Sequence, residues 1–286
     1  MKSRRGLTAA AIAGVFLLGL ALLLYPSLSR YWNTVRQAKS ILGYSDSVSK
    51  LQAEEQARLR EAAQAFNRAL TERPSPYVLP EELEADYAAA LLIGGSDVMC
   101  YLEIPILDIT LPVRHGTESE TLQHSVGHLA WSSLPIGGES THCVLSGHRG
   151  LPSSELLTNI DRLERGDVFR IHVLGETLTY RVDRIAVVEP GDFSLLGVEP
   201  GEDYVTLLTC TPYGINSHRL LVRGARVQDG AALSGEGGGP ELPNELEVYD
   251  GRLTALVAAA ALALVVLPLT ALLARRRGRG GAACDG

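Results

Sequence analysis

The sequence predicts a mainly β protein, in which an all-β barrel with short helices follows a helical N-terminal stalk and is flanked by two transmembrane helices. Two long stretches near the ends of the chain contain no charged residue, and a charged, Ala- and Leu-rich segment follows the first of them. The middle of the chain is divided into short runs of Val, Ile, Leu, Thr and Tyr, which are typical of strands. With 286 residues, 46% of them apolar, the chain is long enough to bury a core of ordinary size.

The uncharged stretches, residues 7–24 and 253–274, are each long enough to cross the hydrocarbon core of a membrane. A cleaved signal peptide is the alternative for the first stretch, but its apolar run is too long and no A-x-A-like site follows it. A buried core helix is the alternative for the second, but an arginine cluster follows it immediately, as in a stop-transfer segment. We therefore expect both stretches to span the membrane.

Basic residues lie outside both predicted spans. Lys2, Arg4 and Arg5 precede the first span, and the arginines of residues 275–286 follow the second. The positive-inside rule therefore places residues 1–6 and the basic tail 275–286 in the cytoplasm, and everything between the spans outside the cell.

The chain is acidic, with 26 Lys and Arg against 33 Asp and Glu and a formal net charge of -7. Residues 6–274 alone hold 19 basic and 32 acidic residues, a net charge of about -13. This balance lacks the basic footprint of a nucleic-acid-binding protein, and it keeps the exterior domain off an anionic membrane surface.

The exterior segment divides into three parts. Residues 25–96 are predicted to form a helical stalk and a lid loop. The stalk is indicated by apolar residues between positions 51 and 70, which recur at helical spacing. The lid loop is expected at about residues 73–80, where closely spaced prolines exclude helix and strand. Residues 97–228 are predicted to form the barrel, and the Gly-rich residues 229–252 a linker. The strand-like runs are 98–105, 109–116, 141–148, 167–175, 176–190, 203–210 and 218–227, and residues 120–129 and 153–163 are expected to form one or two helical turns each.

Cys210 ends the apolar run TLLTC and precedes Thr-Pro-Tyr-Gly, a turn sequence, so its thiol is expected at the end of a strand. A small buried hydrophobe is the alternative role for this cysteine. Arg219 opens the next strand-like run, and a hairpin between the two would bring its guanidinium beside the thiol, where a permanent cation stabilises a developing oxyanion. A surface salt bridge is the alternative for Arg219.

A nucleophilic cysteine needs a partner for proton transfer. Of the 7 histidines, His148 in VLSGHRG is the strongest candidate, because it follows a strand and is flanked by Gly147 and Gly150, which permit a tight turn. His142 and His172 lie inside strand patterns, where we expect them to pack or to hydrogen-bond structurally.

The order THCVLSGHRG, then TLLTC, then Arg219 resembles the sortases, whose signature is T-L-x-T-C with a histidine upstream. Longer runs resemble class C, the pilus-assembling sortases, which also carry a second, C-terminal membrane span. This resemblance covers roughly residues 30–275 and implies a closed eight-stranded β-barrel of the sortase type. The longer runs are GHLAWSSLPIGGESTHCVLSGHRGLPSSELLTNIDRL, IHVLGETLTYRVD and TLLTCTPYGINSHRLLVRG.

The resemblance also implies a mechanism. Cys210 would attack the Thr-Gly carbonyl of an LPxTG-type sorting signal to form a thioacyl enzyme, His148 would act as general acid and then general base, and Arg219 would stabilise the oxyanion or position the substrate. The implied partners are LPxTG-type pilin or surface proteins, an acceptor amine that in this class is typically a pilin lysine, and the cell membrane. This chemistry needs no metal ion or organic cofactor.

Class C sortases resemble one another in a lid, usually Asp-Pro-aromatic, whose aromatic ring covers the cysteine and whose Asp pairs with the catalytic arginine. The corresponding residues here are Ser75, Pro76 and Tyr77, with an ordinary loop as the alternative. Because Ser75 cannot form the ion pair with Arg219, the closed state is expected to be weaker than in the family pattern. Tyr77→Ala is expected to raise the reactivity of the Cys210 thiol.

Three other functions are considered. A sortase that anchors surface proteins to the cell wall would share Cys210, His148 and Arg219 and differ only in the acceptor amine. A non-enzymatic scaffold module would use the same residues structurally. The L,D-transpeptidases place a histidine close before the cysteine in an S-H-G-C run, which this sequence lacks.

The remaining cysteines form no C-x-x-C pair, which argues against a structural zinc site. Cys100 and Cys143 lie in strand-like runs and are expected to be buried free thiols, with a disulfide between them as the alternative. Cys284 is expected to be a cytoplasmic thiol, with acylation as the alternative.

Overall fold

The structure is a computed structural model that describes residues 2–72 and 77–227. The described residues belong to two compact units, residues 2–31 to one and residues 32–72 and 77–227 to the other. The predicted linker 229–252, the predicted span 253–274 and the basic tail lie outside the described residues.

The first helix, α1 (Lys2–Ser49), joins the predicted N-terminal span and the start of the predicted stalk in one element, and Pro26 lies inside it without ending it. Its segment Ala13–Ser49 has a mean hydropathy of 1.5 in its most apolar window. Among the residues that the structure describes, this is the one helix long and apolar enough to cross a membrane.

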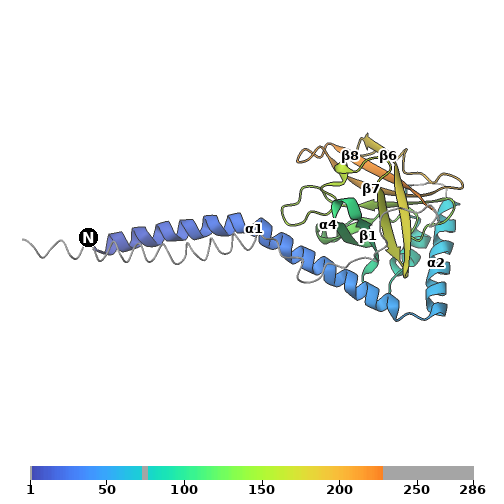
Figure 1. The fold of residues 1–286 in the computed structure, drawn as a ribbon, viewed down its shortest axis with the longest axis horizontal. Helices are drawn as coiled ribbons and strands as arrows, with labels where there is room; N and C mark the ends of the chain where they lie inside the picture. The colour runs from blue at the N-terminus through green and yellow to red at the C-terminus, as the bar shows by residue number, and fades with distance from the viewer. Residues whose placement is uncertain (1, 73–76, 228–286) are drawn as a thin grey trace, which may run out of the picture. The chain divides into compact units, whose positions relative to one another are not determined.

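The second unit begins within α1 and continues with α2 (Ala53–Thr71), which buries one face, including Phe66 and Leu70. Two polar groups connect the helices to the barrel. The Tyr44 hydroxyl of α1 accepts a hydrogen bond of 3.0 Å from the backbone N–H of Leu174, and Asn67 Oδ1 of α2 accepts one of 2.7 Å from Leu134. The end of α1 and α2 therefore share a core with the strands (Figure 1).

Eight strands form a closed barrel in the order β1-β2-β3-β4-β7-β8-β6-β5, which confirms the predicted eight-stranded barrel. The strands are β1 (Val98–Ile104), β2 (Ile109–His115), β3 (Val126–His128), β4 (Thr141–Ser146), β5 (Val168–Val173), β6 (Glu176–Val188), β7 (Asp203–Thr211) and β8 (His218–Arg226). The short helices are η1 (Glu81–Leu83), α3 (Glu84–Ala89), η2 (Pro105–Leu107), α4 (Ser119–His124) and η3 (Ile160–Arg162).

The two runs expected to form one or two helical turns do so over part of their length. The run 120–129, expected to be helical, forms α4 and then the three-residue strand β3, which pairs with β2 and β4. In the run 153–163 the only helical segment is the three-residue η3. Both segments take their structure from barrel contacts, because neither is long enough to establish a period of its own.

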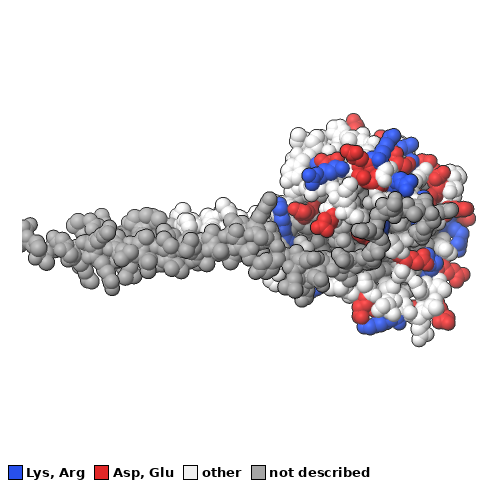
Figure 2. Space-filling view, viewed as in Figure 1, with Lys and Arg blue, Asp and Glu red and all other residues white. Residues whose placement is uncertain are grey.

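Strand direction decides where the site lies. β4 pairs with β7 in parallel, and β7 pairs with β8 antiparallel. The C-terminal ends of β4 and β7 and the N-terminal end of β8 therefore lie at the same end of the barrel. Figure 2 shows acidic and basic side chains interspersed over the visible face of this unit.

Candidate active site

The β7–β8 hairpin places Cys210 directly opposite Arg219. Leu208 and Cys210 are partly exposed, whereas Leu207 and Thr209 are buried, so the thiol belongs to the outer face of the barrel. Cys210 is a free thiol. The Arg219 guanidinium donates through one nitrogen to the carbonyl oxygens of Asn216, at 3.3 Å, and His218, at 3.1 Å. The cation is therefore held at the mouth of the hairpin, beside the thiol-bearing strand.

His148 follows β4 at the same end of the barrel. The parallel ladder between β4 and β7 ends where Ser146 faces Leu208. One residue later, the N–H of Gly147 donates to the carbonyl of Leu208 at 3.1 Å, and Thr209 Oγ1 donates to the carbonyl of Gly147 at 2.8 Å. The turn that carries His148 therefore begins directly after the last contacts between β4 and β7, next to the end of β7 that holds Cys210.

Both glycines beside His148 have a steric reason to be glycine. A Cβ at Gly147 would lie 2.7 Å from Leu157 Cγ. Gly150 has φ +79°, and a Cβ there would lie 3.0 Å from the ring of Tyr213, in the β7–β8 loop. The turn that carries His148 therefore packs closely against the segment behind it and against the loop that follows Cys210.

An apolar strip leads along the outer face from the Cys210 end of the barrel. It consists of Val144 of β4, Leu208 of β7, Leu221 of β8 and Leu196 of the β6–β7 loop, which form one cluster. Val144, Leu221 and Leu196 are buried beneath the residues packed against them, so the strip can contact an extended chain near the thiol only when those residues move away.

Tyr77 packs beside this strip, and it belongs to the same cluster. Its ring lies 5.4 Å from the ring of Trp131 and 5.4 Å from that of Phe193, centroid to centroid. Ser75 and Pro76 lie outside the described residues. Trp131 and Phe193 were not singled out from the sequence, since both lie in segments without a periodic pattern.

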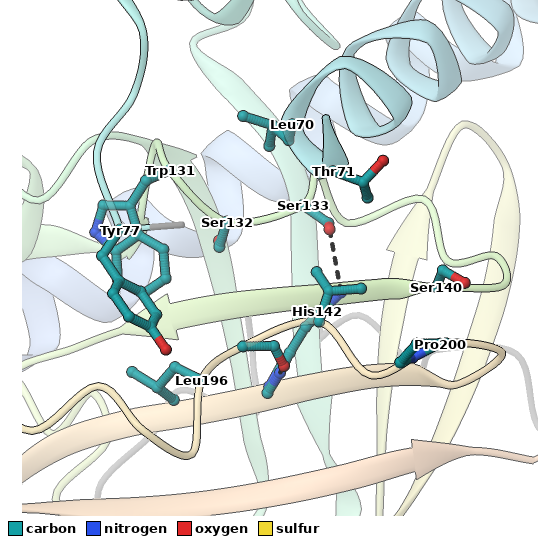
Figure 3. A pocket seen from close by; sticks show the side chains of 12 residues that line it. Leu70, Thr71, Tyr77, Trp131, Ser132, Ser133, Ser140, His142, Leu196 and Pro200 are labelled. Carbon is teal, nitrogen blue, oxygen red and sulfur yellow. Dashed lines mark hydrogen bonds between the residues drawn. The ribbon is translucent and has the colours of Figure 1, made fainter. Parts of the chain in front are cut away.

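A cavity of about 520 Å³ lies beyond Tyr77 and Trp131, with His142 and Leu196 in its wall (Figure 3). His142 is bonded through Nδ1 to the carbonyl of Gly197 at 2.8 Å and through Nε2 to Thr206 Oγ1 at 2.7 Å. Burial lowers the pKa of His142 and so favours the neutral ring. The expected structural role of His142 is confirmed: it holds the β6–β7 loop against β4 and β7.

His172, the other histidine expected to be structural, is bonded through Nε2 to Glu103 Oε2 at 2.6 Å and through Nδ1 to Thr177 at 3.0 Å. Cys100 and Cys143 are both buried free thiols, and burial raises the pKa of each. Burial disfavours the thiolate, so Cys210 is the better placed of the three described cysteines for nucleophilic chemistry. Cys284 lies outside the described residues.

Within residues 2–72 and 77–227, no group of three or more His, Cys, Asp or Glu side chains is arranged to hold a metal ion. Three neighbouring strands bring a thiol, an imidazole and a guanidinium to the Cys210 end of the barrel.

Comparison with protein families matches residues 102–227 to the sortase domain. Among solved structures, the chain is 44% identical to sortase C1 from Streptococcus agalactiae, with a TM-score of 0.65, over 67% of this chain and 99% of that one. It is 44% identical to sortase C from Streptococcus pneumoniae, with a TM-score of 0.61, over 66% of this chain and 97% of that one. Sortase C-1 from Actinomyces oris matches at 43% identity with a TM-score of 0.57, over 61% of this chain and 99% of that one.

Among curated proteins, sortase D from Bacillus subtilis is 31% identical over 129 residues, which are 44% of this chain and 62% of that protein. A sortase of class E from Streptomyces coelicolor is 29% identical over 141 residues, which are 45% of this chain and 40% of that protein. The chain thus spans less than two thirds of the length of these curated relatives.

Proposed function

Because the chain belongs to the sortase family of cysteine transpeptidases and its solved structural relatives are class C sortases, we propose that it is a membrane-anchored pilus-assembling enzyme. It cleaves an LPxTG-like sorting signal between Thr and Gly and transfers the acyl group to a lysine amine of a pilin. The observation that carries this proposal is the pairing of Cys210 with Arg219 at the barrel end where β4 delivers His148.

In the proposed first step, the Cys210 thiolate attacks the Thr carbonyl carbon. The oxyanion that forms is stabilised by the Arg219 guanidinium, which lies on the facing strand. When the C–N bond to Gly breaks, the imidazolium of His148 gives its proton to the leaving amine. The products are a thioacyl enzyme and a peptide that begins with Gly.

In the second step, the acceptor lysine amine attacks the thioacyl carbonyl and gives its proton to the neutral His148. The C–S bond breaks, an isopeptide bond forms, and the Cys210 thiolate and the His148 imidazolium are regenerated together. Tyr77 is proposed to act as a lid residue, because its ring packs against Trp131 and Phe193 beside the apolar strip. The two-span topology, with both termini in the cytoplasm, remains part of the proposal, and α1 is its candidate anchor.

The test is intact-mass spectrometry of the full-length protein in detergent after mixing with an LPxTG-type peptide. We expect an adduct equal in mass to the acyl fragment, absent from Cys210→Ala. His148→Ala should slow its formation by about 10²–10⁴-fold, because the general acid is lost. Arg219→Ala should slow it by about 10²–10³-fold, because an oxyanion-stabilising group is lost. Near-normal acylation in any of the three variants would rule out the role assigned to that residue.

The acceptor is tested on the preformed thioacyl enzyme. A peptide that carries a pilin-type lysine should release the acyl group as an isopeptide product faster than water does. If an amine of cell-wall peptide type is preferred over the lysine, pilus polymerisation is wrong and cell-wall anchoring is the function.

A further inference from the structure

Arg149, the residue after His148, has a side chain that is only 9% exposed. One terminal nitrogen of its guanidinium lies 2.5 Å from Asp161 Oδ2 in η3, and the other donates to Thr211 Oγ1 at 3.3 Å. The guanidinium carbon also lies 5.9 Å from the centroid of the Tyr213 ring. One side chain therefore contacts η3, the end of β7 and the β7–β8 loop.

These contacts lie where backbone pairing between β4 and β7 has ended. The last backbone hydrogen bond of that ladder reaches Gly147, and the carbonyl of His148 accepts instead from the N–H of Leu157. Past this point the two segments are tied by side chains, through Thr209 to Gly147 and through Arg149 to Thr211. The second of these joins the residues that directly follow His148 and Cys210.

The side chain is suited to this task. A guanidinium presents its donors in a rigid fork, so holding one nitrogen on Asp161 fixes the direction in which the other points. Its Nε is buried without a hydrogen-bond partner among the described residues. Because a buried unpaired donor is unfavourable, fold stability alone is a weak reason for an arginine at this position.

We propose that Arg149 is a positioning residue, which holds the His148 turn in register with Cys210 by bridging Asp161 and Thr211. This inference rests on the proposed function, since it assigns Arg149 a role in delivering the His148 proton. It is distinct from the roles of Cys210, His148 and Arg219, because the guanidinium acts through its neighbours and not on the substrate.

The test compares full-length Arg149→Met with the native protein in three measurements: single-turnover acylation by an LPxTG-type peptide, the KM for that peptide, and alkylation of Cys210 by iodoacetamide. We expect acylation to slow at least tenfold, with KM changed less than twofold and alkylation slowed by a smaller factor than acylation, because alkylation uses the Cys210 thiolate but requires no proton from His148. Arg162→Met is the matched control, since this arginine is exposed in η3, and it should behave as the native protein does.

A second pair of variants isolates the hydrogen bond. Thr211→Val removes the acceptor and should slow acylation about three- to tenfold, and adding it to Arg149→Met should slow acylation less than twofold further. Thr211→Val also keeps the proposal testable if Arg149→Met does not fold. Three outcomes would overturn the inference while leaving the proposed function intact. The first is native-like acylation in Arg149→Met, and the second is a double variant in which the slowing by Arg149→Met and the slowing by Thr211→Val multiply. The third is an equal loss of alkylation and acylation in Arg149→Met. A native protein that forms no thioacyl adduct would overturn both.

Discussion

Replacing Tyr77 by alanine should open the apolar strip beside Cys210. The ring of Tyr77 makes two aromatic contacts, with Trp131 and with Phe193, both at 5.4 Å between centroids. All three side chains belong to the cluster that includes Leu208, two residues before Cys210. Alanine removes both ring contacts and leaves the strip in place.

The size of the effect follows from these two contacts. Each aromatic pair stabilises a packed arrangement by about 0.5–1.5 kcal/mol, so Tyr77→Ala weakens the closed state by about 1–3 kcal/mol. At about 1.4 kcal/mol per factor of ten, the population with the strip uncovered rises about 5- to 150-fold. We expect kcat/KM for peptide acylation to rise by up to this factor, until the strip is open most of the time.

The assay measures acylation of full-length Tyr77→Ala at low peptide concentration, with iodoacetamide labelling of Cys210 alongside. Tyr77→Phe is the matched control, because it keeps the ring and should stay within twofold of the native rate. Labelling should rise as well, by a smaller factor, because iodoacetamide is smaller than the peptide. Unchanged acylation in Tyr77→Ala, or an equal increase in Tyr77→Phe, would refute the reasoning that ring packing covers the strip.

Three further predictions concern stability. Gly224→Ala should lower the free energy of unfolding by about 1–3 kcal/mol, because a Cβ there would lie 2.6 Å from the Phe169 ring. Gly191→Ala is the control and should have little effect, because the space around Gly191 is open; chemical denaturation measures both variants. Burial lowers the pKa of His128 from 6.5 to about 4, so the unfolded chain takes up a proton before the folded chain does as the pH falls. The free energy of unfolding should therefore drop by about 3 kcal/mol between pH 6.5 and pH 4. His128→Gln should flatten this decline, as measured by thermal unfolding across that pH range. Arg223→Met should lower the free energy of unfolding by about 1–2 kcal/mol in the same assay, because it leaves two partly exposed carboxylates on the β6–β7 loop side without their cation.

The long strands could be predicted because their patterns are local. The runs that became β7 and β8 are rich in apolar and β-branched residues, most of which are buried, and Thr-Pro-Tyr-Gly between them is a turn signal. β3 could not be predicted in this way, because three residues are too short a run to show a strand pattern. The close approach of β3 to the segment that follows β2 depends on Gly127, where a Cβ would lie 2.2 Å from the carbonyl oxygen of Gly116. A single sequence carries no sign of that contact.

The residues of the candidate site show the same difference between local contacts, which the sequence predicts, and distant contacts, which it does not. Cys210 and Arg219 are nine residues apart, so a hairpin between them could be anticipated, and the structure pairs them. His148 follows β4, whose parallel pairing with β7 joins segments distant in the sequence, and the register of that pairing depends on the whole barrel closing. The contacts of Tyr77 and of Arg149 are equally non-local, and neither Trp131 nor Thr211 carries a sequence signal that points to its partner.

Closure of the barrel limits how a peptide can be recognised. Each of the eight described strands has a hydrogen-bonded neighbour on both sides, so none of them is a free edge strand of the sheet. A bound segment cannot join the sheet as a ninth strand and gain affinity from main-chain pairing that ignores its sequence. It has to lie across the strands and be judged by its side chains, which favours selective over broad recognition. Changes in substrate preference should therefore map to the loops and outward-facing residues around the barrel, while the barrel itself stays constant.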